Sequence, residues 1–148
     1  MRLHVSGRSA VFAVALALAV ALAVALAGCT PDGPDTGTKT FIVAGTVRLT
    51  GQSGFTVGQP CTGTGDYADL HDGAEVVVSG PDGERLGVGQ LNAGTGTAEG
   101  DAVWCVWTFF VVDVSAEPDA YDVEVTDRGR HRFDVSGIHG RVDLSIPG

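Results

Sequence analysis

The chain has 148 residues, nine of them basic and eighteen acidic, so its formal net charge is −9. Such an acidic surface repels nucleic acid and anionic lipid headgroups, so we expect no nucleic-acid partner. The length left after any leader suits one domain with its own core.

The chain opens with a basic start and a long apolar run. Arg2 and Arg8 precede an unbroken apolar segment, built almost wholly of Ala, Val and Leu, over residues 10–27. This order is typical of a secretory signal. An uncleaved signal anchor is the alternative, because a run of about 18 residues lies at the lower edge of what spans a bilayer.

The run ends in Leu26-Ala27-Gly28-Cys29, which resembles the lipobox of bacterial lipoproteins. The resemblance implies cleavage before Cys29 and a diacylglycerol on its thiol, so residues 1–28 are a lipoprotein signal peptide. Two acyl chains anchor a protein stably, which places the mature chain on the outer face of the cell membrane. Without the two basic residues of the leader, the mature chain has seven basic and eighteen acidic residues, a net charge near −11.

The two remaining cysteines, Cys61 and Cys105, would lie in an oxidising compartment. A disulfide between them is therefore expected. Two free thiols or a metal pair are the alternatives, although two cysteines without nearby histidines make a poor zinc site.

Residues 29–40 combine the lipidated cysteine with a stretch rich in Gly, Pro and Thr. This composition predicts a flexible tether, followed by a folded domain over residues 41–148. A first strand is expected over residues 41–50. The Gly-rich stretch 52–65 is expected to hold one short strand near residues 55–57.

The clearest hairpin in the chain is predicted around Gly80-Pro81-Asp82-Gly83. Proline presets one backbone angle of a turn and glycine supplies a positive one. Residues 74–79 and 85–91 on either side are the two strands. The Gly- and Thr-rich residues 92–101 are predicted to form a loop.

Residues 102–114 form the longest and most apolar predicted strand. One face carries Val103, Cys105, Trp107, Phe109 and Val111, and the other carries Trp104, Val106, Phe110 and Val112. Two apolar faces indicate a central strand that is covered on both sides. The alternative is that the second face docks a partner.

Further strands are predicted over residues 121–126, 130–135 and 141–146, and nothing after residue 29 has helical periodicity. Seven or eight short strands at this spacing predict an all-β fold, a small immunoglobulin-like or transthyretin-like β-sandwich.

The middle of the chain resembles a secreted or lipoprotein domain family of actinobacteria whose function is unassigned. The resemblance covers about 70 residues and supports pairing of the two cysteines, but it implies no activity. The matching residues are Cys61, Gly63, Gly65, Tyr67, Asp69, Leu70, Gly73, Val76, Val78, Cys105, Tyr121, Val123, Val125, Arg128 and Gly129. The strand around Tyr121 is also similar to the tyrosine-bearing strand of immunoglobulin-like and transthyretin-like sandwiches, which implies a structural role for Tyr121.

The best candidate for a metal site is the acidic loop that holds Asp66, Asp69 and Asp72, with His71 beside them. Carboxylate and carbonyl oxygens are the ligands that Ca²⁺ prefers, but the spacing is not that of an EF-hand. Glu99 and Asp101 of a neighbouring loop are possible additional ligands. The alternative is that these residues only fill turns.

A basic cluster, Arg128, Arg130 and Arg132, stands out in this acidic chain. It is a candidate binding site for an anionic ligand. The alternative is an exposed strand face whose charges are neutralised by nearby carboxylates.

No catalytic set can be assigned from the spacing of nucleophiles, histidines or paired carboxylates. We therefore expect a non-enzymatic binding or accessory module of the cell envelope, with no cofactor and with an envelope protein as its partner. The alternative function is a small metal-dependent hydrolase or a Ca²⁺-binding domain that uses the loop from Asp66 to Asp72.

Overall fold

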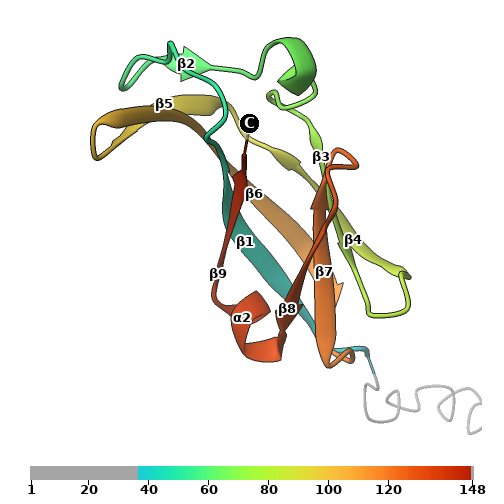
Figure 1. The fold of residues 1–148 in the computed structure, drawn as a ribbon. Helices are drawn as coiled ribbons and strands as arrows, with labels where there is room; N and C mark the ends of the chain where they lie inside the picture. The colour runs from blue at the N-terminus through green and yellow to red at the C-terminus, as the bar shows by residue number, and fades with distance from the viewer. Residues whose placement is uncertain (1–36, 148) are drawn as a thin grey trace, which may run out of the picture. The chain divides into compact units, whose positions relative to one another are not determined.

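The computed structural model describes residues 37–147, which form an all-β domain (Figure 1). The predicted leader, the lipidation site Cys29 and most of the tether lie outside these residues. The strands are β1 (Thr40–Leu49), β2 (Pro60–Cys61), β3 (Glu75–Ser79), β4 (Arg85–Leu91), β5 (Gly94–Glu99), β6 (Ala102–Ser115), β7 (Ala120–Val125), β8 (Arg130–Asp134) and β9 (Arg141–Ile146). The two helical segments are the 3-10 turn η1 (Gly65–Tyr67) and the short helix α2 (Val135–His139).

The nine strands belong to one sheet, with the order β2-β5-β6-β4-β3-β7-β8. Strand β1 pairs with the other edge of β6, and β9 pairs with β1 in the only parallel pairing among the described strands. The two ends of the bent sheet share one core, since the ring of Phe41 on β1 meets that of Tyr121 on β7 at 5.5 Å. The predicted all-β fold is confirmed, with nine strands in a continuous sheet instead of seven or eight.

The core follows the alternation of side chains along each strand. On β6 the side chains of Cys105, Trp107, Phe109 and Val111 are fully buried, whereas Phe110 points outward. Helix α2 lies between β8 and β9 in Figure 1, and its Ile138 joins the same core. Tyr121 is buried there too, and its hydroxyl donates to the carbonyl of Ser115 at 3.1 Å, which is the structural role expected for it.

The predicted hairpin of β3 and β4 is confirmed. Its turn is closed by the Gly83 amide, which donates to the carbonyl of Gly80 at 3.0 Å. Gly83 has a φ of +83°, a conformation that favours glycine.

Three local predictions are wrong. The predicted loop over residues 92–101 contains strand β5, and the short strand of this region is β2 at Pro60–Cys61 rather than near residues 55–57. The segment after β8 turns into helix α2, because the Asp134 carboxylate accepts a hydrogen bond from the Gly137 amide at 2.7 Å and caps the helix.

The predicted disulfide is present between Cys61 on β2 and Cys105 on β6, with 5.8 Å between their Cα atoms. Because β5 lies between these two strands in the sheet, the bond ties the outermost strand to the centre of the domain.

The described part of the chain contains no helix that is long and apolar enough to cross a bilayer.

Candidate functional site

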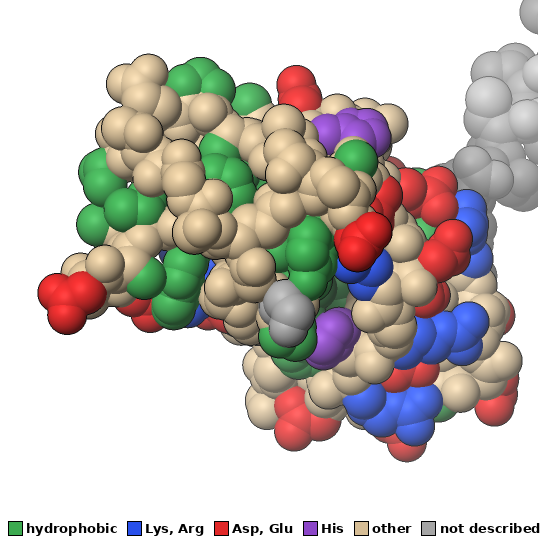
Figure 2. Space-filling view, turned by 45° about the horizontal axis from the view of Figure 1, so that its top comes forward, with side chains coloured by type: hydrophobic (Ala, Val, Ile, Leu, Met, Phe, Trp, Pro, Cys, Tyr) green, Lys and Arg blue, Asp and Glu red, His purple; other side chains and the backbone are tan. Residues whose placement is uncertain are grey.

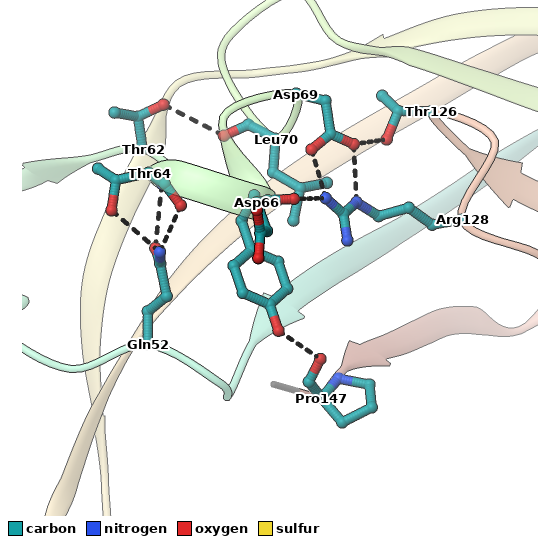
Figure 3. Close-up of polar contacts among 10 residues, drawn as sticks. Gln52, Thr62, Thr64, Asp66, Asp69, Leu70, Thr126, Arg128 and Pro147 are labelled. Atoms are coloured by element: carbon teal, nitrogen blue, oxygen red, sulfur yellow. Dashed lines mark hydrogen bonds and ion pairs between the residues drawn. The ribbon is translucent and has the colours of Figure 1, made fainter.

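The acidic loop is held by a network of polar contacts that centres on Asp69 (Figure 3). The carboxylate of Asp69 accepts hydrogen bonds from Thr126 at 2.6 Å and from Nε of Arg128 at 2.7 Å. A second guanidinium nitrogen of Arg128 contacts the other carboxylate oxygen, so the ion pair is bidentate. This pair fastens the loop after η1 to the turn between β7 and β8.

Tyr67 extends this network to the end of the domain. The guanidinium of Arg128 lies 4.9 Å from the centroid of the Tyr67 ring, and the Tyr67 hydroxyl donates to the carbonyl of Pro147 at 3.1 Å. Close packing also explains Gly63, since a Cβ there would lie 1.9 Å from the carbonyl oxygen of Tyr67. Each of these contacts joins two parts of the chain, so their role is structural. We call the acidic loop, with its contacts to Thr126, Arg128 and Pro147, the clasp.

The structure does not bring Asp66, Asp69 and Asp72 together as metal ligands. No group of three or more metal-ligating side chains occurs among residues 37–147. Asp72 is exposed, and Glu99 forms an ion pair with Arg48 at 3.3 Å. Nδ1 of His71 lies 2.8 Å from the carbonyl oxygen of Asp72.

The clasp is expected to weaken in acid. The hydrogen bonds and charge of Arg128 lower the pKa of Asp69 from 3.8 to about 2. Because the folded-state pKa is depressed, the ionised clasp stabilises the domain fully above pH 3.8, and this contribution is lost as the pH falls through about 2. Asp69 is partly exposed, so screening by solvent limits this contribution to about 1 kcal/mol.

Measuring the free energy of unfolding against pH for the wild type and Asp69→Asn tests this expectation. The wild type should be more stable by about 1 kcal/mol at pH 7, and the two curves should approach each other below pH 3. A constant difference down to pH 2 would contradict the role assigned to the ionised carboxylate.

The three arginines of the basic cluster are distributed over three separate ion pairs. Besides the pair of Arg128, Arg130 lies 3.4 Å from Glu124, and Arg132 lies 2.9 Å from Asp122. The cluster is therefore neutralised by neighbouring carboxylates, as the second of the two sequence interpretations expected.

The outer face of the sheet carries the exposed large apolar side chains of the described strands. Ile42 on β1 is 61% exposed, Phe110 and Val112 on β6 are 57% and 55% exposed, and Val88 on β4 is 43% exposed. We call these four residues the outer patch. Trp104 and Val106, which lie further along the same face of β6, are half-buried.

The strand register makes the outer patch contiguous. Phe110 is the partner of Ala44 on β1 and of Gln90 on β4, and Ile42 and Val88 lie two residues further along these strands, in the direction of Val112. The register between β1 and β6 shifts beside Ile42, where a bulge contains Val112 and Asp113. Asp113 adopts a φ of +56° in this bulge, which adds an exposed carboxylate to the edge of the patch.

The prediction that β6 is covered on both faces is therefore wrong at Phe110 and Val112. Nothing within residues 37–147 buries these two side chains. The sequence did not indicate Ile42 or Val88, because an exposed apolar residue on a short alternating strand carries no signal until its neighbours are known.

Comparison with known proteins identified no relative of this chain. No protein-family model, curated protein or solved structure matches the chain. The resemblances to an actinobacterial domain family and to the lipobox therefore stay predictions.

Proposed function

We propose that the protein is a lipid-anchored, extracytoplasmic binding module that docks through the outer patch onto a protein at the membrane surface. The observation that carries the proposal is the contiguous exposure of Ile42, Val88, Phe110 and Val112 on one face of a sheet. Exposed apolar surface of this kind marks interaction sites, because single apolar residues are common on surfaces and contiguous groups are not.

The proposed anchor explains why the partner should lie at the membrane. Ten residues separate Cys29 from Thr40, where β1 begins. A flexible chain of this length has a mean end-to-end distance of roughly 18 Å. Ile42 is the third residue of β1, so lipidation of Cys29 would hold the outer patch close to the bilayer.

Charge argues for a protein partner rather than for the lipid itself. Asp82 and Glu84 in the β3–β4 turn, Asp113 in the bulge and Glu117 after β6 lie toward the end of the sheet where β1 begins. These four carboxylates form no ion pair with any described residue. Anionic headgroups would be repelled by them. The surface fits a partner with apolar side chains bordered by Lys and Arg.

Photocrosslinking in native membranes tests this proposal. A photoreactive amino acid at Val112 of the lipidated protein should form one discrete protein adduct, and the same probe at exposed Asp72 should not. Phe110→Lys should reduce the adduct at least ten-fold, since it places a charge within the apolar contact surface. Thr97→Lys is the matched control, because Thr97 is exposed on β5 outside the patch.

Two further measurements test the roles of charge and of the anchor. High salt should weaken the adduct, and Cys29→Ala, which removes the proposed anchor, should reduce it. Adducts of equal yield at positions 112 and 72, adducts to lipid or to a second copy alone, or an adduct that Phe110→Lys leaves intact would each overturn the proposal.

A further inference from the structure

A second surface lies at the opposite end of the sheet from the start of β1. Thr40 pairs with Ser115 at one end of β6, and Ala102 begins β6 at the other end. With about 3.3 Å per residue, the two ends lie roughly 40 Å apart. Beside Ala102, the loop of residues 50–55 and the start of β6 enclose a cleft of about 430 Å³. A neighbouring cleft of about 390 Å³ shares Gly54 and Phe55 with it.

Two aromatic residues line the first cleft. Trp104 contributes from β6 and Phe55 from the loop; both are half-buried, and Phe55 also packs against the core. The guanidinium of Arg48 lies 5.9 Å from the centroid of the Trp104 ring and also pairs with Glu99. These contacts hold the indole in position at the wall of the cleft, and the charge of Arg48 is already neutralised.

The same loop offers polar groups that the domain does not use. Among the described residues, no backbone hydrogen bond involves the N–H or C=O groups of residues 51–55. The side chains of Ser53 and Asp101, which also line the cleft, have no hydrogen-bond partner within the described part of the chain. The cleft thus combines aromatic surface with free donors and acceptors, the usual composition of a small-ligand site.

The first half of the loop is nevertheless held by hydrogen bonds. The side-chain amide of Gln52 donates to the carbonyl of Thr64 at 2.6 Å and accepts from the Thr64 amide at 3.1 Å. The Thr50 amide donates to the carbonyl of Ile146 at 3.0 Å. A ligand that enters the cleft would therefore meet a preformed wall, which lowers the entropic cost of binding.

The charge distribution indicates that the ligand is uncharged. Figure 2 shows that most acidic and basic side chains gather over the β3, β7 and β8 side of the domain, whereas the β2 and β5 side is mainly hydrophobic and neutral, with acidic side chains only at its edge. Asp101 is the only charged residue that lines the cleft.

We propose that this cleft binds an uncharged saccharide. The apolar faces of sugar rings would stack on Trp104 and Phe55, while their hydroxyl groups would donate to and accept from the free groups of the loop and from Asp101. This inference does not depend on the outer patch, which lies on another part of the sheet.

Calorimetric titration of the full-length protein, in a detergent without a sugar headgroup, tests the inference. The probes are the neutral trisaccharides chitotriose and maltotriose, with tetramethylammonium as the cationic alternative. We expect one trisaccharide to bind with a Kd on the order of 1 mM or tighter, typical of a shallow site. Trp104→Ala should weaken this binding at least ten-fold, and Phe110→Ala, an exposed aromatic of the same strand face, should leave it unchanged.

Ser53→Arg provides a second variant in case Trp104→Ala does not fold, since Ser53 is exposed and a long side chain there would fill the cleft. It should also abolish binding. The inference is overturned if neither trisaccharide binds, if binding survives both variants, or if only tetramethylammonium binds.

Discussion

Replacing Cys61 and Cys105 together by alanine is expected to lower the free energy of unfolding by about 4 kcal/mol. The bond closes a loop with a sequence separation of 44 residues, and removing it restores the chain entropy of that loop to the unfolded state. The native state also depends on the bond locally. Strand β2 has two residues and pairs with β5 only at Thr95 and Gly94, so the disulfide is its firmest connection to the core.

Thermal unfolding measures this effect. For a domain of this size, a loss of about 4 kcal/mol corresponds to a fall in Tm of roughly 15–20 °C. A reductant should lower the Tm of the wild type by a similar amount and leave the double alanine variant unchanged. If the reductant does not affect the wild type, the bond does not stabilise the domain.

Elements that repeat a strong local pattern could be predicted from the sequence. The β3–β4 hairpin follows from a Gly-Pro-Asp-Gly turn between two apolar runs, β6 follows from a long apolar run, and β7 follows from its alternation. The disulfide followed from the number of cysteines, since only two remained after Cys29. In each case, a few neighbouring residues or a simple count were sufficient.

Strand β5 could not be predicted, because its glycines are required by tertiary contacts. A Cβ at Gly94 would lie 2.5 Å from Nε1 of Trp107, and one at Gly96 would lie 2.1 Å from the carbonyl oxygen of Thr56. When only neighbouring residues are considered, a glycine-rich stretch predicts a loop. In β5 the glycines instead allow a buried side chain and the segment of residues 50–60 to approach the strand closely.

The candidate site could be predicted only in part, for the same reason. The acidic loop was identified, but its role depends on Arg128, which lies 59 positions after Asp69. The apolar character of both β6 faces was evident, yet exposure of Phe110 and Val112 depends on which strands flank β6 and on what covers them. Partners distant in sequence decide whether an acid binds a metal and whether an apolar face is core.

The second large effect is expected for Arg132→Ala. Its partner Asp122 is 4% exposed, and two hydrogen bonds of 2.9 Å from Arg132 satisfy the carboxylate. The hydrogen bonds and charge of Arg132 lower the pKa of Asp122. Removing the guanidinium leaves a buried carboxylate without its partner, which is strongly destabilising in buried pairs. Because Arg132 itself is largely exposed, we expect the loss at pH 7 to be smaller than for a fully buried pair but clearly larger than for a surface pair.

Arg130→Ala is the matched control, since Arg130 lies on the same strand and its pair with Glu124 spans 3.4 Å at the surface. Chemical denaturation at pH 7 should show a loss below about 0.5 kcal/mol for this variant. Adding Asp122→Asn to Arg132→Ala should recover part of the stability, because an amide is less costly to bury than a charge. Equal losses for the two arginine variants would show that burial of Asp122 does not set the strength of its pair.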